Sequence, residues 1–123
     1  MTSKKYALIS VYSKEGIVEF AKALQSVGYE IISTGGTYKF LVENDIKAIP
    51  IEQITKNPRE IFDGRIKTIS FQIEGGILYD RKKSQHIADA GRLGIPRIDV
   101  VVCNLYPFER KRNIESIDVG GPT

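Results

Sequence analysis

Apolar and polar residues follow one another along this chain in two patterns, which predict strands and helices in turn. Short and nearly continuous apolar runs are typical of buried strands, and we expect strands at 6–11, 29–33, 48–51, 73–79 and 98–104. Apolar residues spaced three or four positions apart are typical of one helix face, and we expect helices at 17–27, 38–44 and 85–93. Residues 55–65 carry turn signals, so an irregular connection is expected there.

This order of elements predicts an α/β fold with a parallel sheet flanked by helices on both faces. The run from Ile98 to Asn104 is nearly continuous, as in parallel strands that helices cover on both sides. No repeat or linker interrupts the pattern, so residues 1–123 are expected to form one domain. Because Gly120-Gly121 is a turn that usually introduces another element, we expect this domain to be truncated at its C-terminus.

Composition narrows the class of protein without naming a function. The 123 residues are 41% apolar, which suits one globular core. No apolar run approaches the ~18 to 20 residues of a membrane span and no leader opens the chain, so we expect a cytoplasmic protein without membrane contact. One cysteine and one histidine, Cys103 and His86, favour no metal cluster, and His86 is expected to be a solvated helix residue. The net charge of +3 is too dispersed to favour nucleic acid.

Polar residues follow three of the predicted strands at the point where each strand ends. Tyr12, Ser13 and Lys14 come after the first strand, Thr34-Gly35-Gly36-Thr37 after the second, and Asn104-Leu105-Tyr106 after the last. In open parallel sheets the carboxyl ends of the strands meet at one edge, where ligands bind. We therefore expect these three loops to face one crevice.

Thr34-Gly35-Gly36-Thr37 has the features of an anion cradle at the start of a helix. Glycines allow a ligand close to the backbone, hydroxyls flank them, and the following helix dipole favours negative charge. A phosphate is therefore the expected ligand. The alternative is structural, with the glycines serving a tight turn and the threonines capping the helix. The segment matches neither the P-loop nor the dinucleotide-binding pattern, so neither a nucleoside triphosphate nor NAD is inferred.

Four other polar residues each have a chemical and a structural interpretation. Lys67 lies with Arg65 and Thr68 in a short segment that suits an oxyanion, although a basic surface loop would look similar. Lys14 has the same two interpretations. Tyr106 either donates to a ligand or packs as an interfacial or core aromatic residue. Asp118 either accepts from a ligand nitrogen or caps the next element.

Five ordered blocks closely resemble the inosine monophosphate cyclohydrolase domain. They are Ile32-Ser33-Thr34-Gly35-Gly36-Thr37, Asp63-Gly64-Arg65-Ile66-Lys67-Thr68, Gly75-Gly76-Ile77-Leu78, Cys103-Asn104-Leu105-Tyr106-Pro107-Phe108 and Ile117-Asp118-Val119-Gly120-Gly121-Pro122-Thr123. The resemblance runs essentially from end to end. In that family the domain is the N-terminal part of a bifunctional purine-biosynthesis protein, whose other half is the aminoimidazole carboxamide ribonucleotide (AICAR) transformylase. The resemblance implies a single methylglyoxal-synthase-like domain over residues 1–123.

The resemblance also implies a reaction and a set of residues that perform it. The reaction is the dehydrative ring closure of formyl-AICAR ribonucleotide to inosine monophosphate, for which no cofactor is required. The expected catalytic residues are Lys67, which would polarise the formyl oxygen, and Tyr106 and Asp118, which would orient the carboxamide or assist proton transfer. The expected substrate-binding residues are Tyr12, Ser13, Lys14, Thr34, Gly35, Gly36, Thr37, Arg65, Ile66, Lys67, Thr68, Cys103, Asn104, Asp118 and Val119.

The chain departs from the family pattern at several positions. Two histidines of the family motif are replaced by Ser70 and Glu74, and an anion near a phosphorylated ligand should weaken affinity if its side chain faces inward. The stretch between Phe108 and Ile117 is shorter than usual in the family. The segment that supplies a further catalytic lysine has no counterpart in this chain.

Three functions are compatible with these features. The first is the cyclohydrolase, with a purine ribonucleotide as substrate and product, a homodimer by analogy with the family, and a possible transformylase domain in cis. The second is a ligand-sensing module without catalysis, since the same fold serves as a regulatory site in carbamoyl-phosphate synthetases. The third is methylglyoxal synthase, a lyase of the same fold, which is least favoured because His86 is not placed for that chemistry.

Overall fold

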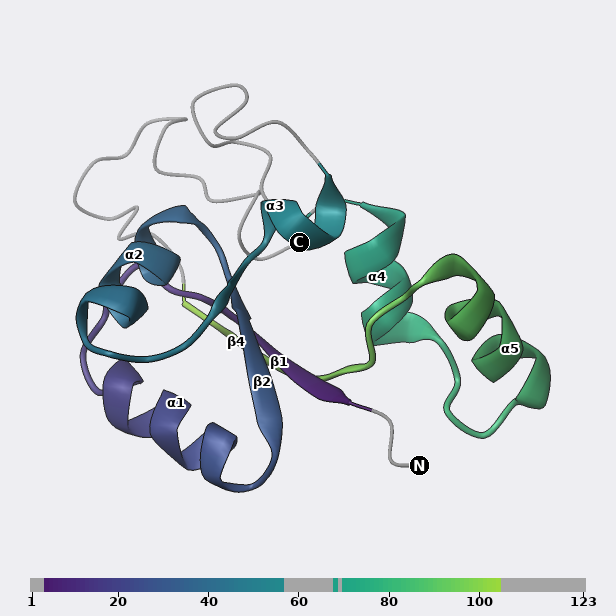
Figure 1. Cartoon of the computed structure of the whole chain (residues 1–123), viewed down its shortest axis with the longest axis horizontal. Helices are drawn as coiled ribbons and strands as arrows, with labels where there is room; N and C mark the ends of the chain where they lie inside the picture. The colour runs from purple at the N-terminus through teal and green to yellow at the C-terminus, as the bar shows by residue number, and fades with distance from the viewer. Residues whose placement is uncertain (1–3, 57–67, 69, 105–123) are drawn as a thin grey trace.

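The computed structural model describes residues 4–56, 68 and 70–104, and the statements below concern these residues. The strands are β1 (Lys5–Ser10), β2 (Tyr29–Ser33), β3 (Ile49–Pro50) and β4 (Ile98–Cys103). The helices are α1 (Ile17–Ser26), α2 (Gly35–Glu43), α3 (Glu52–Thr55), α4 (Phe71–Leu78) and α5 (Ser84–Leu93). Strands and helices follow one another along most of this length, as Figure 1 shows.

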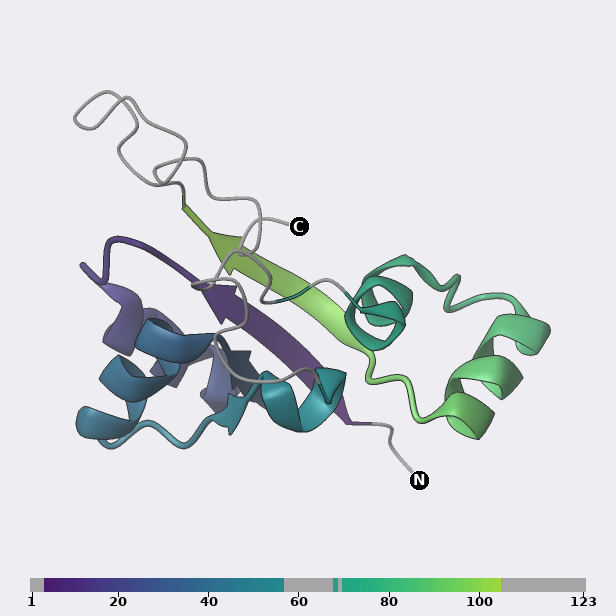
Figure 2. The same ribbon diagram turned by 90° about the horizontal axis from the view of Figure 1, so that it is seen from above.

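The four strands of the described residues form one sheet in the order β3-β2-β1-β4. Every pair is parallel, and Leu8 of the central strand β1 lies between Ile32 of β2 and Val101 of β4. Figure 2 shows β1 and β4 side by side and pointing the same way. The carboxyl ends of these strands therefore meet at one edge of the sheet, as the sequence predicts.

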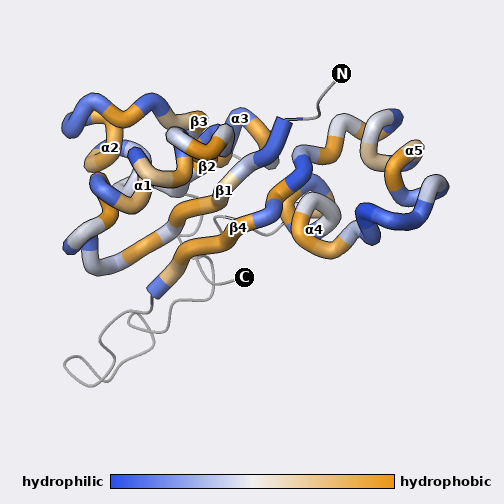
Figure 3. Tube along the Cα trace, turned by 90° about the horizontal axis from the view of Figure 1, so that it is seen from below, coloured by the Kyte–Doolittle hydropathy of each residue, from blue (hydrophilic) through white to orange (hydrophobic). Residues whose placement is uncertain are grey.

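Two clusters of buried side chains cover the two faces of the sheet. Helices α1 and α2 contribute to the first cluster, through Ile17, Ala21, Leu24 and Leu41, against alternate residues of β1 and β2. Helix α4 contributes Ile73 to the second, against Leu8 and Ile32. In Figure 3 the hydrophobic colour runs along β1 and β4 between these layers. The predicted α/β sheet with helices on both faces is confirmed.

The prediction of a strand at 73–79 is wrong, because this segment lies in helix α4. The Ser70 hydroxyl accepts a hydrogen bond of 3.1 Å from the Ile73 backbone amide and so caps the helix. Ile73 is buried and Ile77 packs beside it in the second cluster, which is the spacing of one helix face. Gly75-Gly76-Ile77-Leu78 is an unbroken run of glycine and apolar residues, which has the pattern of a buried strand and obscures the helical spacing.

Two other predicted boundaries need correction. Helix α2 begins at Gly35 rather than near Tyr38, so both glycines form its first turn instead of a loop before it. Strand β3 pairs with β2 through Ile49 and Pro50 alone, which is shorter than the run 48–51. Proline has no backbone N–H to donate, so a longer ladder is disfavoured there.

Strand β4 is less deeply covered than its apolar run indicated. Val101 is 45% exposed and Cys103 is exposed, while Ile98 is buried. β4 is the last strand in the order of the described sheet, and its register against β1 shifts between Tyr6 and Ala7. The next pair after Tyr6 and Ile98 is Ala7 and Val100, so Asp99 is an extra residue in the ladder. Val100 therefore packs against the first cluster, although Ile98, two residues earlier, packs in the second.

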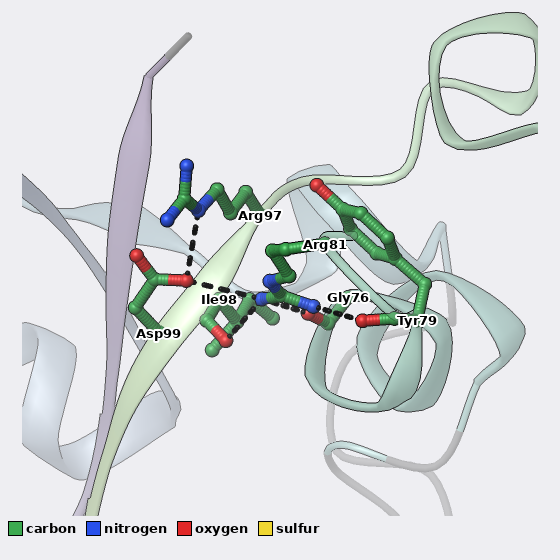
Figure 4. A network of polar contacts seen from close by, with 6 residues as sticks. All are labelled: Gly76, Tyr79, Arg81, Arg97, Ile98 and Asp99. Carbon is green, nitrogen blue, oxygen red and sulfur yellow. Dashed lines mark hydrogen bonds and ion pairs between the residues drawn. The ribbon is translucent and has the colours of Figure 1, made fainter. Parts of the chain in front are cut away.

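Arg81 fastens the end of α4 to the start of β4 (Figure 4). Its guanidinium donates to the carbonyls of Gly76 at 2.7 Å, Ile98 at 2.8 Å and Tyr79 at 2.8 Å, and to Asp99 Oδ1 at 3.1 Å. Arg97 donates to the same Asp99 oxygen at 3.0 Å. Burial raises the pKa of Asp99, but hydrogen bonds and charges from Arg97 and Arg81 outweigh it and hold the pKa below 3.8.

Helix α5 lies outermost, beyond α4, in both Figure 1 and Figure 2. Ala90 is its buried residue, whereas Ile87 and Leu93 are about half exposed. His86 lies on α5 as expected, and its Nδ1 accepts a hydrogen bond of 2.9 Å from the Asp80 amide. Within the described ranges, no helix combines the length and the apolar character needed to cross a membrane.

Candidate functional site

The carboxyl edge of the sheet brings together three segments that are far apart in the sequence. The pairings Ile9 with Ser33 and Ser10 with Cys103 place the ends of β2 and β4 on either side of β1. The loop after β1, residues 11–14, therefore lies between the start of α2 and Asn104. The described parts of the three loops therefore lie side by side, as hydrogen bonds from Thr37 and Asn104 to the loop after β1 show, whereas the crevice that they are expected to face stays a prediction.

Asn104 joins the end of β4 to the loop after β1 through its side-chain amide. Its Oδ1 accepts from the Tyr12 amide at 2.5 Å and from the Ser13 amide at 3.2 Å. Its Nδ2 donates to the Ser13 carbonyl at 3.2 Å. The side-chain amide of Asn104, an expected substrate-binding residue, is thus engaged with the backbone of the neighbouring loop.

The hydroxyls of Thr34 and Thr37 are buried and hydrogen-bonded inside the protein. Thr37 Oγ1 accepts from the Val11 amide and donates to the Val11 carbonyl, both at 3.1 Å. Thr34 Oγ1 donates to Ser10 Oγ at 2.8 Å. Both threonines are at most 3% exposed. These hydroxyls therefore connect α2 to β1, and the backbone of the first turn of α2 is what this segment presents to a ligand.

Gly35 and Gly36 lie exposed in that first turn. Neither has a positive φ, and a Cβ built on either would meet no heavy atom within 4 Å. Neither backbone conformation nor local packing therefore demands glycine here, although glycine in a helix costs roughly 0.5–1 kcal/mol relative to alanine. Thr34 makes no side-chain capping hydrogen bond to this helix, so its side chain leaves the first N–H groups of α2 available to another acceptor.

Lys14 presents a fixed cation at the same edge. Its Nζ donates to the Val11 carbonyl at 2.5 Å and to the Tyr12 carbonyl at 3.0 Å. The side chain is partly buried, whereas Tyr12 and Ser13 are exposed. An ammonium held in this way loses little further freedom when it meets an anion.

A hollow of about 410 Å³ opens beside the glycines of α2. It is lined by Gly35, Gly36, Tyr38, Lys39, Val42, Glu43 and Glu52. The helix start and Lys39 favour an anion on one part of this lining, and the two carboxylates disfavour it on another. A phosphate group is therefore better accommodated at the glycines than beside Glu43 and Glu52.

The remaining predicted site residues divide into described and undescribed ones. Thr68 is fully buried, and Cys103 is exposed at the end of β4. Arg65, Ile66, Lys67, Tyr106, Asp118 and Val119 lie outside the described residues, so their predicted roles stay predictions. Within the described part, no group of three or more His, Cys, Asp or Glu side chains is arranged to hold a metal ion.

Sequence reasoning missed the structural roles of three serines. Ser10 lies within an apolar run, yet its hydroxyl accepts from Thr34 across the sheet. Ser33 is fully buried, and its Oγ has no hydrogen-bond partner among the described residues. Ser70 caps α4, which an N-cap search would have found had the segment been taken as a helix.

Glu74 lies in the first turn of α4, where the helix dipole favours a negative charge. The residue is partly buried, and its Oε1 is buried without a hydrogen-bond partner in the described structure. This oxygen therefore points into the protein rather than into solvent.

Comparison with protein families matches residues 16–123 to the model of the MGS-like domain. Two curated relatives carry the name Bifunctional purine biosynthesis protein PurH. The one from Thermoanaerobacter sp. (strain X514) is 52% identical over 128 residues, and the one from Caldicellulosiruptor saccharolyticus is 51% identical over 128 residues. Each match covers 97% of this chain and 25% of the relative, so the chain spans about a quarter of their length.

A solved structure described as the crystal structure of ForH has a similar fold. It superposes with a TM-score of 0.81 at 30% sequence identity. The match covers 96% of this chain and 63% of that one. The arrangement of sheet and helices described above is therefore shared by a protein of known structure.

Proposed function

We propose that this chain, which belongs to the family of MGS-like domains, binds a purine ribonucleotide at the carboxyl edge of its sheet. In this proposal it converts formyl-AICAR ribonucleotide to inosine monophosphate. One observation carries the proposal. Two exposed glycines open α2 where three loops meet, and nothing inside the described structure requires glycine at either position. A ligand that approaches the backbone closely accounts for both.

The phosphate is the part of the ligand whose recognition the described residues support. Backbone N–H groups at the start of α2 suit its oxygens, and the dipole of this helix favours its charge. Lys14 contributes a cation held by two backbone carbonyls of the neighbouring loop. The base and the reacting groups would then extend toward Asn104 at the end of β4.

The proposed reaction is a ring closure that releases water. The carboxamide nitrogen forms a bond to the formamido carbon, and the formyl oxygen leaves with one hydrogen from each of the two nitrogens. An amide nitrogen is a weak nucleophile, so the site must hold the two groups in contact and stabilise the oxyanion. We assign the polarisation of the formyl oxygen to Lys67, and the orientation of the carboxamide and proton transfer to Tyr106 and Asp118.

A second candidate is a module that binds the nucleotide without turning it over. The observation in its favour concerns the two positions where the family pattern has histidines. Ser70 is committed to capping α4, and Glu74 has a carboxylate oxygen turned into the protein. Neither side chain replaces an imidazole as a proton carrier near neutral pH.

The assembly of the whole protein is part of the proposal as well. The curated relatives are about four times as long as the matched region. We propose that this domain works beside a transformylase domain in cis and as a homodimer, as the family resemblance implies. Analytical ultracentrifugation of this chain tests the second point, and a monomer at all concentrations up to millimolar contradicts it.

Two measurements together test the proposed function. Calorimetric titration with inosine monophosphate should give a saturable binding curve, and incubation with formyl-AICAR ribonucleotide should give inosine monophosphate in a spectrophotometric assay. Binding without turnover supports the sensing module instead. The absence of saturable heat at millimolar ligand, together with the absence of product, contradicts both.

A further inference from the structure

We propose that Asn104 is a positioning residue whose side-chain amide fixes the shape of the loop after β1, and that it serves the nucleotide site through this loop. The inference deepens the proposed function, because it names the group that prepares the site for its ligand. It concerns the free protein in the first place, so it can be tested without any ligand.

Within the described part of the chain, the hydrogen bonds of the Asn104 side chain end on the backbone of two residues. Oδ1 accepts from the Tyr12 and Ser13 amides, and Nδ2 donates to the Ser13 carbonyl. These partners are 91 and 92 residues away in the sequence. An Asn amide offers two lone pairs and two N–H donors, so three of its four hydrogen-bonding positions are used on the loop.

The position of Asn104 explains why this contact is needed. The ladder between β1 and β4 ends at the pair Ser10 and Cys103. Beyond that point the β1 chain turns away, and its exposed amides lose their strand partner. The side chain of the next residue after β4 takes over at Tyr12 and Ser13. The Asn104 side chain therefore provides the hydrogen-bond acceptor for two backbone amides past the end of the ladder.

A second anchor holds the same loop from the other side. Thr37 in the first turn of α2 bonds both the amide and the carbonyl of Val11. Three consecutive residues of the loop, Val11, Tyr12 and Ser13, are thus tied to α2 and to β4. Because Lys14 Nζ donates to the carbonyls of Val11 and Tyr12, the cation depends on the shape of this loop. Asn104 thereby positions the Lys14 ammonium through the loop, without a hydrogen bond to it.

Amide hydrogen exchange of the free protein, followed by NMR, tests the clamp. In Asn104→Leu the Tyr12 and Ser13 amides should exchange about tenfold faster than in the wild type, which corresponds to the loss of one such hydrogen bond. In Asn104→Asp both should stay within about threefold of the wild type, because a carboxylate still accepts from both amides. Asn44→Leu is the matched control, since Asn44 donates to Phe40 O at the exposed end of α2.

The outcomes separate this inference from the proposed function. If Asn104→Leu leaves the Tyr12 and Ser13 exchange rates unchanged while Leu8 stays protected, the clamp is refuted. If the clamp holds, inosine monophosphate should bind about tenfold more weakly to Asn104→Leu and unchanged to Asn44→Leu. Weaker binding without faster exchange would make Asn104 a direct ligand and overturn the positioning role. Failure of the wild type to bind inosine monophosphate would refute the proposed function and leave the exchange result standing.

Discussion

Single residues decide what the carboxyl edge of the sheet offers to a ligand. Thr34 and Thr37 were expected to place hydroxyls on a phosphate, but their hydroxyls bond Ser10 and Val11. The sequence could not show this, because these partners lie 24 and 26 residues away. Gly35 and Gly36 fit the expectation, since their exposed backbone is what a close ligand requires.

The glycine at position 36 gives a prediction at this scale. Gly36→Ala should keep or raise the stability of the fold, by up to about 1 kcal/mol, because the added Cβ meets nothing and alanine favours the helix. The same Cβ tilts toward the start of the helix, so the affinity for inosine monophosphate should fall about tenfold or more. Thermal unfolding and calorimetry measure the two effects.

Gly91→Ala is the matched control for this substitution. Gly91 also lies inside a helix, α5, where a Cβ would meet no heavy atom within 4 Å. It should gain stability in the same way and leave the affinity unchanged. Equal affinities of Gly36→Ala and the wild type would mean that no ligand rests on the start of α2.

At the scale of elements, α4 shows what apolar runs alone cannot predict. Its segment, 73–79, has the apolar run of a strand. In the helix that forms instead, Gly76 lies close to a neighbouring loop, and a Cβ there would lie 2.3 Å from the Pro96 carbonyl oxygen. The capping bond of Ser70 and the spacing of Ile73 and Ile77 decide for the helix.

The two glycines of α4 should respond in opposite ways to the same substitution. Gly76→Ala should destabilise the fold by about 2 to 3 kcal/mol, because the backbone of residue 96 has to move. Gly75→Ala should be neutral or stabilising by up to about 1 kcal/mol, since its Cβ would make an ordinary contact of 3.5 Å with Ile95. Urea unfolding measures both, and equal stabilities of the two variants would contradict the packing described for α4.

The junction of α4 and β4 predicts a dependence of stability on pH. The pKa of Asp99 is held below 3.8 in the folded state, so this carboxylate stabilises the fold at neutral pH. As the pH falls below about 4, Asp99 becomes protonated in the unfolded chain before it does in the folded protein. Its contribution to stability is therefore lost progressively as the pH falls toward its lower pKa in the folded state.

Asp99→Asn tests this contribution. The variant should be less stable than the wild type at pH 7, and the difference should shrink as the pH falls from about 5 toward 2. Asp89→Asn serves as the control, because the Asp89 carboxylate bonds Gln85 and Arg92 on the exposed side of α5 and should change stability little. A difference between Asp99→Asn and the wild type that grows toward low pH would contradict the ion pair of Figure 4.

At the scale of the whole molecule, the strand and helix pattern was sufficient to predict a parallel α/β sheet and the edge at which its loops meet. This works because β1 and β2 are buried on both faces and read as continuous apolar runs. The bonds that shape the site, such as those of Asn104, join residues about 90 apart, and no local pattern encodes them. Two of the five blocks of family resemblance, those with Thr34 and Asn104, contain residues of this edge, but the blocks do not include the loop after β1 and do not show which atoms each segment uses.

The central claim is that a purine monophosphate rests on the carboxyl edge of the sheet, against the start of α2. A titration of the ¹⁵N-labelled protein with inosine monophosphate, followed amide by amide, tests it most directly. We expect saturable shifts at Gly35, Gly36 and Thr37 and along the loop from Tyr12 to Lys14, with Tyr79 and Arg97 at the opposite end unchanged. Shifts confined to Tyr79 and Arg97, or no saturable shift at millimolar ligand, would contradict it.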